Sequence, residues 1–184
     1  MDASASRPWA ARASNSNAEW YTPPEIIERA RAAMGGIDLD PASCAIAQRV
    51  VQAAAWFDRK RDGLAQRWTG NVWLNPPFAR GLIDQFIDKL LDERRNFSQA
   101  ITLVHSRTDA DWFQRLGDIA NAIAFPRGAI KFYNETDCRP SGVYGSAIIY
   151  IGDRRDAFAD AFANCSLIFM AGGGRQGPRL VRAA

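Results

Sequence analysis

The sequence predicts an α/β fold with a largely parallel sheet, on the basis of three observations. Short apolar segments typical of strands alternate with longer segments in which apolar residues recur three and four positions apart. Glycine, proline and small polar residues separate these segments. A length of 184 residues suits one domain. Ligands of such folds bind at the carboxyl ends of strands, and the most unusual polar residues of this chain follow strand-like segments.

Helices are expected where apolar side chains would form one stripe along a helix. Pro23 and Pro24 suit the first turn of the first helix, and Gly35 and Gly36 favour its end. The third helix has the clearest stripe, between Leu82 and Leu91. The expected helices cover residues 23–34, 43–55, 82–91, 109–119 and 153–163.

Strands are expected where a short apolar run is bounded by turn residues. The run at 100–104 is apolar throughout, as in a buried strand, and the run at 71–74 leads directly into an asparagine and two prolines. The expected strands cover residues 37–40, 71–74, 100–104, 122–125, 129–133, 147–151 and 166–169.

The two ends of the chain differ in composition from its centre. Residues 1–18 are rich in Ala, Ser, Arg and Asn without apolar periodicity, and we expect them to be disordered. Residues 171–184 contain a run of glycines and several arginines, and are expected to form a flexible basic tail. Residues 19–170 remain as the folded domain. Of the net charge of +3, the two ends supply +1 and +3, so the domain carries −1.

Composition excludes several classes of protein. The apolar runs are far shorter than the roughly 20 residues that span a bilayer. The polar residues after Met1 lack the apolar core of a secretion signal, so we expect a cytoplasmic protein with no membrane partner. Cys44, Cys138 and Cys165 are far apart, and His105 is the only histidine. Neither a metal site nor a Ser-His-Asp triad is therefore expected.

The most informative segment is Asn75-Pro76-Pro77-Phe78, directly after an expected strand. The prolines fix the backbone and lack N–H donors, which leaves the Pro76 carbonyl beside the Asn75 side-chain oxygen. Two adjacent acceptors match an –NH₂ group, and the aromatic ring offers a stacking surface. The segment predicts a site for an amino-bearing planar base. The structural alternative is a rigid turn with Phe78 in the core.

Two further segments place an acid beside small residues at a strand end. Asp40-Pro41-Ala42-Ser43 opens an expected helix, where small residues let a ligand approach free N–H groups. Asp40 would accept from a cationic amine, or fix the turn. Asp62 would accept from an adenine amine or a ribose hydroxyl, or belong to an ordinary turn.

A fourth segment, Trp20-Tyr21-Thr22-Pro23, precedes the first expected helix. Its two aromatic rings and one hydroxyl would form a lip over a small-molecule pocket. The alternative is a purely structural role, in which these residues form a hydrophobic contact and an N-cap at the start of the helix.

Together and in this order, the segments resemble the phage-type DNA N-6-adenine methyltransferases over residues 19–169. Residues 75–78 match that family's catalytic tetrapeptide, which ends in Phe or Tyr. Residues 20–23 are similar to the family's amino-terminal cofactor motif. Residues 39–43 are similar to the motif that holds the methionine end of S-adenosylmethionine. Residues 62–64, with Trp68, match the segment near the cofactor adenine.

Two later segments, 103–113 and 125–132, extend the resemblance. They contain Arg107, Arg127 and Lys131, which are expected to contact DNA phosphates or bases, with ordinary surface charge as the alternative. The chain departs from the family at Ser43, where many methyltransferases have glycine. The candidate acid for the cofactor ribose is Asp58.

The resemblance implies a single-domain, Rossmann-like fold that uses S-adenosylmethionine, with helices on both faces of the sheet. It implies methylation of N-6 of adenine in DNA, at a base flipped out of the duplex or in a single strand. It also implies a phage or prophage origin. A short or loose site preference is expected, because only about 105–145 is left for site recognition. Two alternatives stay open: methylation of another planar amine or amide, such as an RNA base or a protein glutamine, and a DNA-binding remnant without catalysis. No oligomeric state is predicted.

Overall fold

The computed structural model describes residues 20–79, 81–134, 145–171 and 179–181. Within these ranges the chain forms an eight-stranded sheet in the order β2-β1-β3-β4-β6-β5-β7-β8. The strands are β1 (Leu39–Asp40), β2 (Ala55–Trp56), β3 (Gly70–Leu74), β4 (Phe97–His105), β5 (Ala122–Pro126), β6 (Ser146–Ile151), β7 (Ser166–Met170) and β8 (Arg179–Val181). The helices are α1 (Pro24–Met34), α2 (Gln48–Val51), α3 (Leu82–Asp92), α4 (Asp111–Asp118) and α5 (Arg155–Phe162), with 3₁₀ turns η2 (Gly63–Ala65) and η3 (Glu93–Arg95). None of these helices is long and apolar enough to cross a membrane.

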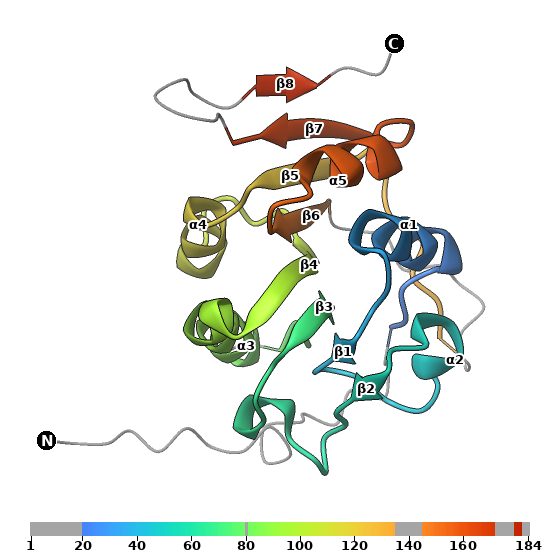
Figure 1. The fold of residues 1–184 in the computed structure, drawn as a ribbon, viewed down its shortest axis with the longest axis vertical. Helices are drawn as coiled ribbons and strands as arrows, with labels where there is room; N and C mark the ends of the chain where they lie inside the picture. Colours follow the sequence, from blue (N-terminus) through green and yellow to red (C-terminus); the bar gives the residue numbers. More distant parts are fainter. Residues whose placement is uncertain (1–19, 80, 135–144, 172–178, 182–184) are drawn as a thin grey trace, which may run out of the picture.

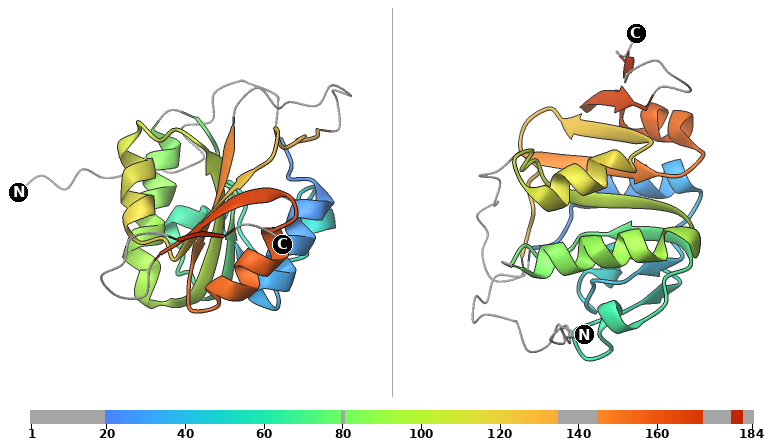
Figure 2. Two further views of the ribbon diagram at one scale, coloured as in Figure 1. Left: turned by 90° about the horizontal axis from the view of Figure 1, so that it is seen from above. Right: turned by 90° about the vertical axis from the view of Figure 1, so that its left-hand side faces the viewer.

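The helices cover both faces of the sheet, so the domain has three layers (Figures 1 and 2). Helices α1, α2 and α5 lie on one face, and α3 and α4 lie on the other. Side chains of one strand alternate between the two faces. Trp73 therefore packs in the core with α1 and α5, whereas Val72 and Leu74 pack in the core with α3 and α4. The α/β class predicted from the sequence is confirmed.

The half of the sheet made by β2, β1, β3 and β4 is parallel, as expected. Helix α3 carries the chain from β3 back to the start of β4, which is the usual connection between parallel neighbours. Because β1 pairs with β3, with Leu39 opposite Val72, the carboxyl ends of the two strands lie side by side. This register brings the turn after Asp40 close to the turn that begins at Asn75.

The other half of the sheet is antiparallel, and the prediction of a largely parallel sheet is wrong there. Helix α4 leads from β4 to β5, which run in the same direction with β6 between them. Residues 127–134, after β5, contain no crossover helix. Strand β6 starts beside the carboxyl end of β5, and so runs antiparallel to it. Helix α5 then carries the chain to β7, which runs parallel to β6 and antiparallel to β5.

The helix expected over 43–55 is much shorter than predicted. It begins at Gln48 and ends at Val51, because Gln52 adopts a left-handed conformation with φ of 45°. The residues after it extend and form β2, a strand that was not predicted from the sequence.

Two more segments differ from the expected elements. Residues 129–133 do not join the sheet; Tyr133 instead forms an isolated bridge with Tyr21. Arg179–Val181, within the expected flexible tail, pairs with β7 as strand β8. The expected leader, 1–18, and the remainder of the tail beyond residue 171 lie outside the described residues.

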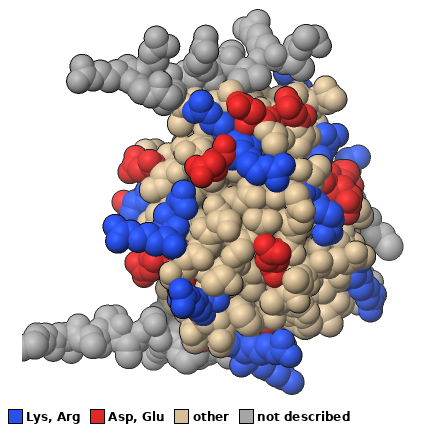
Figure 3. Space-filling model, in the orientation of Figure 1, with Lys and Arg blue, Asp and Glu red and all other residues tan. Residues whose placement is uncertain are grey.

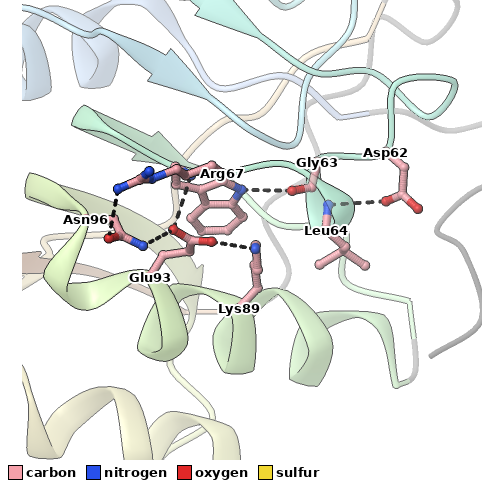
Figure 4. Close-up of polar contacts among 8 residues, drawn as sticks. Asp62, Gly63, Leu64, Arg67, Lys89, Glu93 and Asn96 are labelled. Carbon is pink, nitrogen blue, oxygen red and sulfur yellow. Dashed lines mark hydrogen bonds and ion pairs between the residues drawn. The ribbon is translucent and has the colours of Figure 1, made fainter. Parts of the chain in front are cut away.

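A buried carboxylate fastens the segment before β3 to the end of α3 (Figure 4). Glu93 accepts hydrogen bonds from Lys89 Nζ at 2.5 Å, Asn96 Nδ2 at 2.7 Å and the Trp68 amide at 3.4 Å. Burial opposes ionisation of Glu93, but these hydrogen bonds outweigh it and lower the pKa of Glu93. Trp68 Nε1 in turn donates to the Gly63 carbonyl at 2.8 Å, so the network reaches η2.

Glu93→Ala should lower the free energy of unfolding by about 2–3 kcal/mol, because it leaves the buried Trp68 amide and Lys89 without their charged acceptor. Urea denaturation at pH 7 measures this. Glu28→Ala is the control, since Glu28 pairs with Arg31 on the surface, where an ion pair contributes less than about 1 kcal/mol. Equal unfolding midpoints for Glu93→Ala and the wild type would contradict the prediction.

Candidate active site

A cavity of about 650 Å³ opens at the carboxyl ends of β1 and β3. Its volume is typical of small-molecule sites. It brings together the residues before α1, the turn after β1 and the turn after β3. Of the residues selected from the sequence, it is lined by Trp20, Tyr21, Thr22, Asp40, Ala42, Ser43, Asp58, Asn75, Pro76, Pro77 and Phe78.

The side-chain amide of Asn75 joins two of these segments. Its Nδ2 donates to Thr22 Oγ1 at 3.2 Å, which directs the amide's oxygen away from Thr22. That oxygen, Oδ1, is buried and has no hydrogen-bond partner among the residues described. An unpaired buried acceptor costs about 1–3 kcal/mol. Asn75 Oδ1 is therefore prepared to accept a hydrogen bond from a group outside the chain.

Phe78 lies at the rim of the cavity and is 37% exposed, which rules out the alternative that it belongs to the core. Its ring stacks on the imidazole of His105 at the end of β4, with centroids 3.8 Å apart and planes 9° apart. Phe78 lines the cavity but His105 does not, so His105 covers the ring from the side away from the cavity. Burial lowers the pKa of His105, and the charge of Arg107 lowers it further, so the imidazole is neutral at pH 7.

Asp40 is the buried acid of the cavity, with 3% of its surface exposed. It accepts hydrogen bonds from Gln48 Nε2 at 2.8 Å and from the Ala42 amide at 3.4 Å. Gln48 Nε2 also lies 2.8 Å from Ser43 Oγ, so one side chain of α2 organises the whole turn. Burial raises the pKa of Asp40 to about 7, although the hydrogen bonds from Ser43, Ala42 and Gln48 oppose this rise.

Asp62 does not line the cavity. Its carboxylate accepts from the Leu64 amide at 3.2 Å, and its backbone is left-handed, with φ of 48° (Figure 4). The next residue, Gly63, packs directly against the turn after β1: a Cβ there would lie 1.9 Å from the Pro41 carbonyl oxygen. The segment thus contacts the Asp40 turn through backbone packing at Gly63.

The remaining selected residues also lie outside the cavity lining. Pro23 directly precedes α1 as its N-cap residue, and its carbonyl accepts from the Ile26 amide at 3.1 Å. Arg107 is exposed and makes two hydrogen bonds to Asp109, at 3.0 and 2.9 Å. Arg127 and Lys131 are exposed beyond the end of β5.

Several residues of the site were not among those selected from the sequence. The cavity is also lined by Cys44, Ala47, Val51, Arg59, Lys60, Trp73, Ala79 and Leu82. Gln48 and His105 act from outside the lining, and no pattern in the sequence indicates either role. Arg59 and Lys60 could have been selected from the sequence, because they begin a run of three basic residues, Arg59-Lys60-Arg61. In the part of the chain that the structure describes, no group of three or more His, Cys, Asp or Glu residues could hold a metal ion.

Comparisons with known proteins agree with this arrangement. The family described as DNA N-6-adenine-methyltransferase (Dam) matches residues 11–171, which is most of the chain. A DNA N-6-adenine-methyltransferase of Escherichia phage T1 is 30% identical over 97 residues. These residues are 51% of this chain and 38% of the phage protein, so the chain spans well under half the length of that relative.

The raised pKa of Asp40 predicts a pH dependence of stability that Asp40→Asn should remove. The unfolded carboxyl loses its proton near pH 3.8, whereas the folded one keeps it until about pH 7. Its contribution to stability is therefore complete below pH 3.8 and is lost as the pH rises to about 7. Between these values the wild type should lose on the order of 4 kcal/mol relative to Asp40→Asn.

Urea unfolding of both proteins at intervals from pH 4 to pH 8 measures this difference. Asp92→Asn, at an exposed position, controls for the substitution itself. A constant difference between wild type and Asp40→Asn over this range would show that Asp40 ionises normally.

Proposed function

Since the chain belongs to the DNA N-6-adenine-methyltransferase (Dam) family, we propose that it transfers a methyl group from S-adenosylmethionine to N-6 of adenine in DNA. The observation that carries this proposal is the buried Asn75 Oδ1, which lacks a partner among the described residues. An amino group entering the cavity would supply the missing donor. The family's description and the phage relative agree with this substrate.

The exocyclic amine of adenine is a poor nucleophile, because its lone pair is delocalised into the ring. Asn75 Oδ1 and the Pro76 carbonyl would accept its two hydrogens and favour a pyramidal nitrogen with a localised lone pair. They would also stabilise the positive charge that develops on nitrogen during attack. No strong base is required before attack, since the proton can leave afterwards.

A base inside a duplex cannot reach this cavity, so the target adenine would be flipped out or supplied in a single strand. Phe78 offers a partly exposed ring at the rim, backed on one face by His105. The face of Phe78 toward the cavity is then available for stacking on the base. The stack with His105 limits the rotation of the Phe78 ring and so keeps this face turned toward the cavity.

The residues that line the cavity also support S-adenosylmethionine as the methyl donor. S-Adenosylmethionine would supply an activated methyl group on a sulfonium. Asp40 would accept a hydrogen bond from the ammonium of its methionine end, and the small side chains of Ala42 and Ser43, which line the cavity, leave room for this end of the molecule. Trp20 and Tyr21 would cover the bound molecule, and Asp58 would face its ribose. A bound ammonium would favour the ionised form of Asp40, which burial disfavours.

We further propose a short or loose site preference and a phage or prophage origin. The described chain provides one layered domain without a separate recognition domain within residues 20–134 and 145–171. Arg107, Arg127 and Lys131, near the ends of β4 and β5, remain candidate DNA contacts.

Asn75→Ala should abolish methyl transfer, a loss of at least about 10²–10³-fold, because it removes the acceptor for the reacting amine. Purified protein is incubated with S-adenosylmethionine and unmodified duplex or single-stranded DNA, and the digested nucleosides are analysed for N-6-methyladenine by mass spectrometry. Binding of S-adenosylhomocysteine, measured by calorimetry, should be retained in the variant. Equal rates for variant and wild type would remove the proposed role of Asn75. Methyl transfer only to RNA or to protein glutamine would redirect the proposal to that substrate.

Phe78→Ala should lower kcat/KM for DNA by a factor that corresponds to about 1–3 kcal/mol, because one base-stacking contact is lost. Phe78→Tyr should retain activity, since the ring remains. His105→Ala should lower kcat/KM for DNA by a smaller factor. His105→Phe should keep kcat/KM close to the wild-type value, because it keeps the stack with Phe78. Fluorescence of 2-aminopurine at the target position reports the flipped base. Unchanged fluorescence and kinetics in Phe78→Ala would show that this ring does not contact the base.

A further inference from the structure

We propose that the loop between β2 and η2, residues 58–61, binds the DNA phosphates beside the target base, an inference that rests on the proposed function. The loop has the sequence Asp58-Arg59-Lys60-Arg61, and it contains the only run of three basic residues in the chain. All three basic residues are exposed, and Arg59 and Lys60 also line the cavity. Basic side chains gather at the bottom of Figure 3, where Figure 1 places this loop.

The conformation of the loop is held from within by its acidic residue. Asp58 Oδ1 accepts from the amides of Lys60 at 3.1 Å and Arg61 at 2.9 Å. The Asp62 amide closes the loop by donating to the Asp58 carbonyl at 3.0 Å. The loop therefore has a defined shape, and its three cations are presented by an ordered backbone.

The two acids that flank these cations accept from backbone amides and form no ion pair with Lys60 or Arg61. Asp58 is engaged by backbone amides, and Asp62 accepts from the Leu64 amide at 3.2 Å. Arg61 lies over the ring of Trp56, 5.6 Å from its centroid. Lys60 forms no ion pair with any residue in the described ranges. At Lys60, a polyanion at the mouth of the cavity would thus meet a cation that pairs with no carboxylate in the described ranges.

The position of the loop fits phosphates rather than bases. A flipped base enters the cavity while its sugar and flanking phosphates stay at the opening, and Arg and Lys supply most contacts to phosphates. Side chains that line the mouth are therefore close to the path of the DNA backbone. Arg107, which was selected from the sequence for this role, makes two hydrogen bonds to Asp109.

The test measures DNA binding without a methyl donor, so that it does not depend on methyl transfer. Fluorescence anisotropy with a labelled duplex gives the association constant over a series of KCl concentrations. The variant Arg59→Ala/Lys60→Ala is compared with Arg67→Ala/Arg95→Ala, which removes the same charge. Arg67 and Arg95 are exposed and precede β3 and β4, at the amino ends of these strands, whereas the cavity lies at the carboxyl ends of β1 and β3.

We expect Arg59→Ala/Lys60→Ala to reduce affinity about 10-fold or more near 0.1 M salt, and to reduce the slope of log K against log[KCl] by about 1–2, since each phosphate contact contributes about 0.9. The exchange variant Arg59→Lys/Lys60→Arg should retain affinity, because both charges are kept. The control variant should keep the wild-type slope.

Three outcomes would overturn the inference: an unchanged salt slope in Arg59→Ala/Lys60→Ala, equal losses in the variant and the control, or lost binding of S-adenosylhomocysteine with DNA affinity intact. The last outcome would assign the loop to the small molecule. If the variant shows the expected change in slope relative to the wild type, but the wild type transfers no methyl group, the inference stands and the proposed function fails.

Discussion

The geometry of the cavity depends on one side-chain hydrogen bond, from Asn75 Nδ2 to Thr22 Oγ1. An asparagine amide can turn either its oxygen or its nitrogen toward a ligand, and this bond decides that the oxygen is left over. Thr22 is itself held in place, because its neighbour Tyr21 exchanges backbone hydrogen bonds with Tyr133 at 2.8 and 3.2 Å. The orientation of the acceptor therefore depends on three segments that are far apart in sequence. Disturbing the segment before α1 would change the chemistry at the end of β3 without any change in β3 itself.

Two features of the cavity disfavour folding: the unpaired Asn75 Oδ1 and the buried Asp40 carboxyl. Perturbed groups of this kind concentrate at functional sites, where they are retained although they lower stability. The surrounding structure offsets them by rigid support. Val72, Trp73 and Leu74 are at most 1% exposed and hold the end of β3 between the two cores. The turn after Asp40 is supported through Gly63, whose carbonyl accepts from the buried Trp68.

The parts of the fold that could be predicted are those that depend on local pattern. The stripe of α3 and the apolar run of β4 are such cases, and so is the abrupt end of β3 at Asn75. The short α2 could not be predicted, because its end depends on the left-handed Gln52, which no local pattern indicates. The direction of β6 was missed for another reason: strand patterns do not encode direction, which follows from how consecutive strands are connected. Likewise the stack of Phe78 on His105 joins the ends of two strands, and nothing in either segment alone indicates it.

The distribution of charge explains how a domain of this kind could bind a polyanion. Residues 19–170 carry a net charge of −1, so DNA is not attracted by the domain as a whole. Figure 3 agrees, since acidic and basic side chains are interspersed over the face it shows. Within the domain, attraction must then come from the placement of individual cations. Many of those described are engaged elsewhere: Arg115 pairs with Asp88 and Asp111, and Lys89 with Glu93. Cations at the mouth of the cavity act over short distances, within about a Debye length of 8–10 Å. They favour DNA bound with a phosphate beside the cavity over DNA bound elsewhere on the surface, and so couple non-specific binding to correct placement of the base.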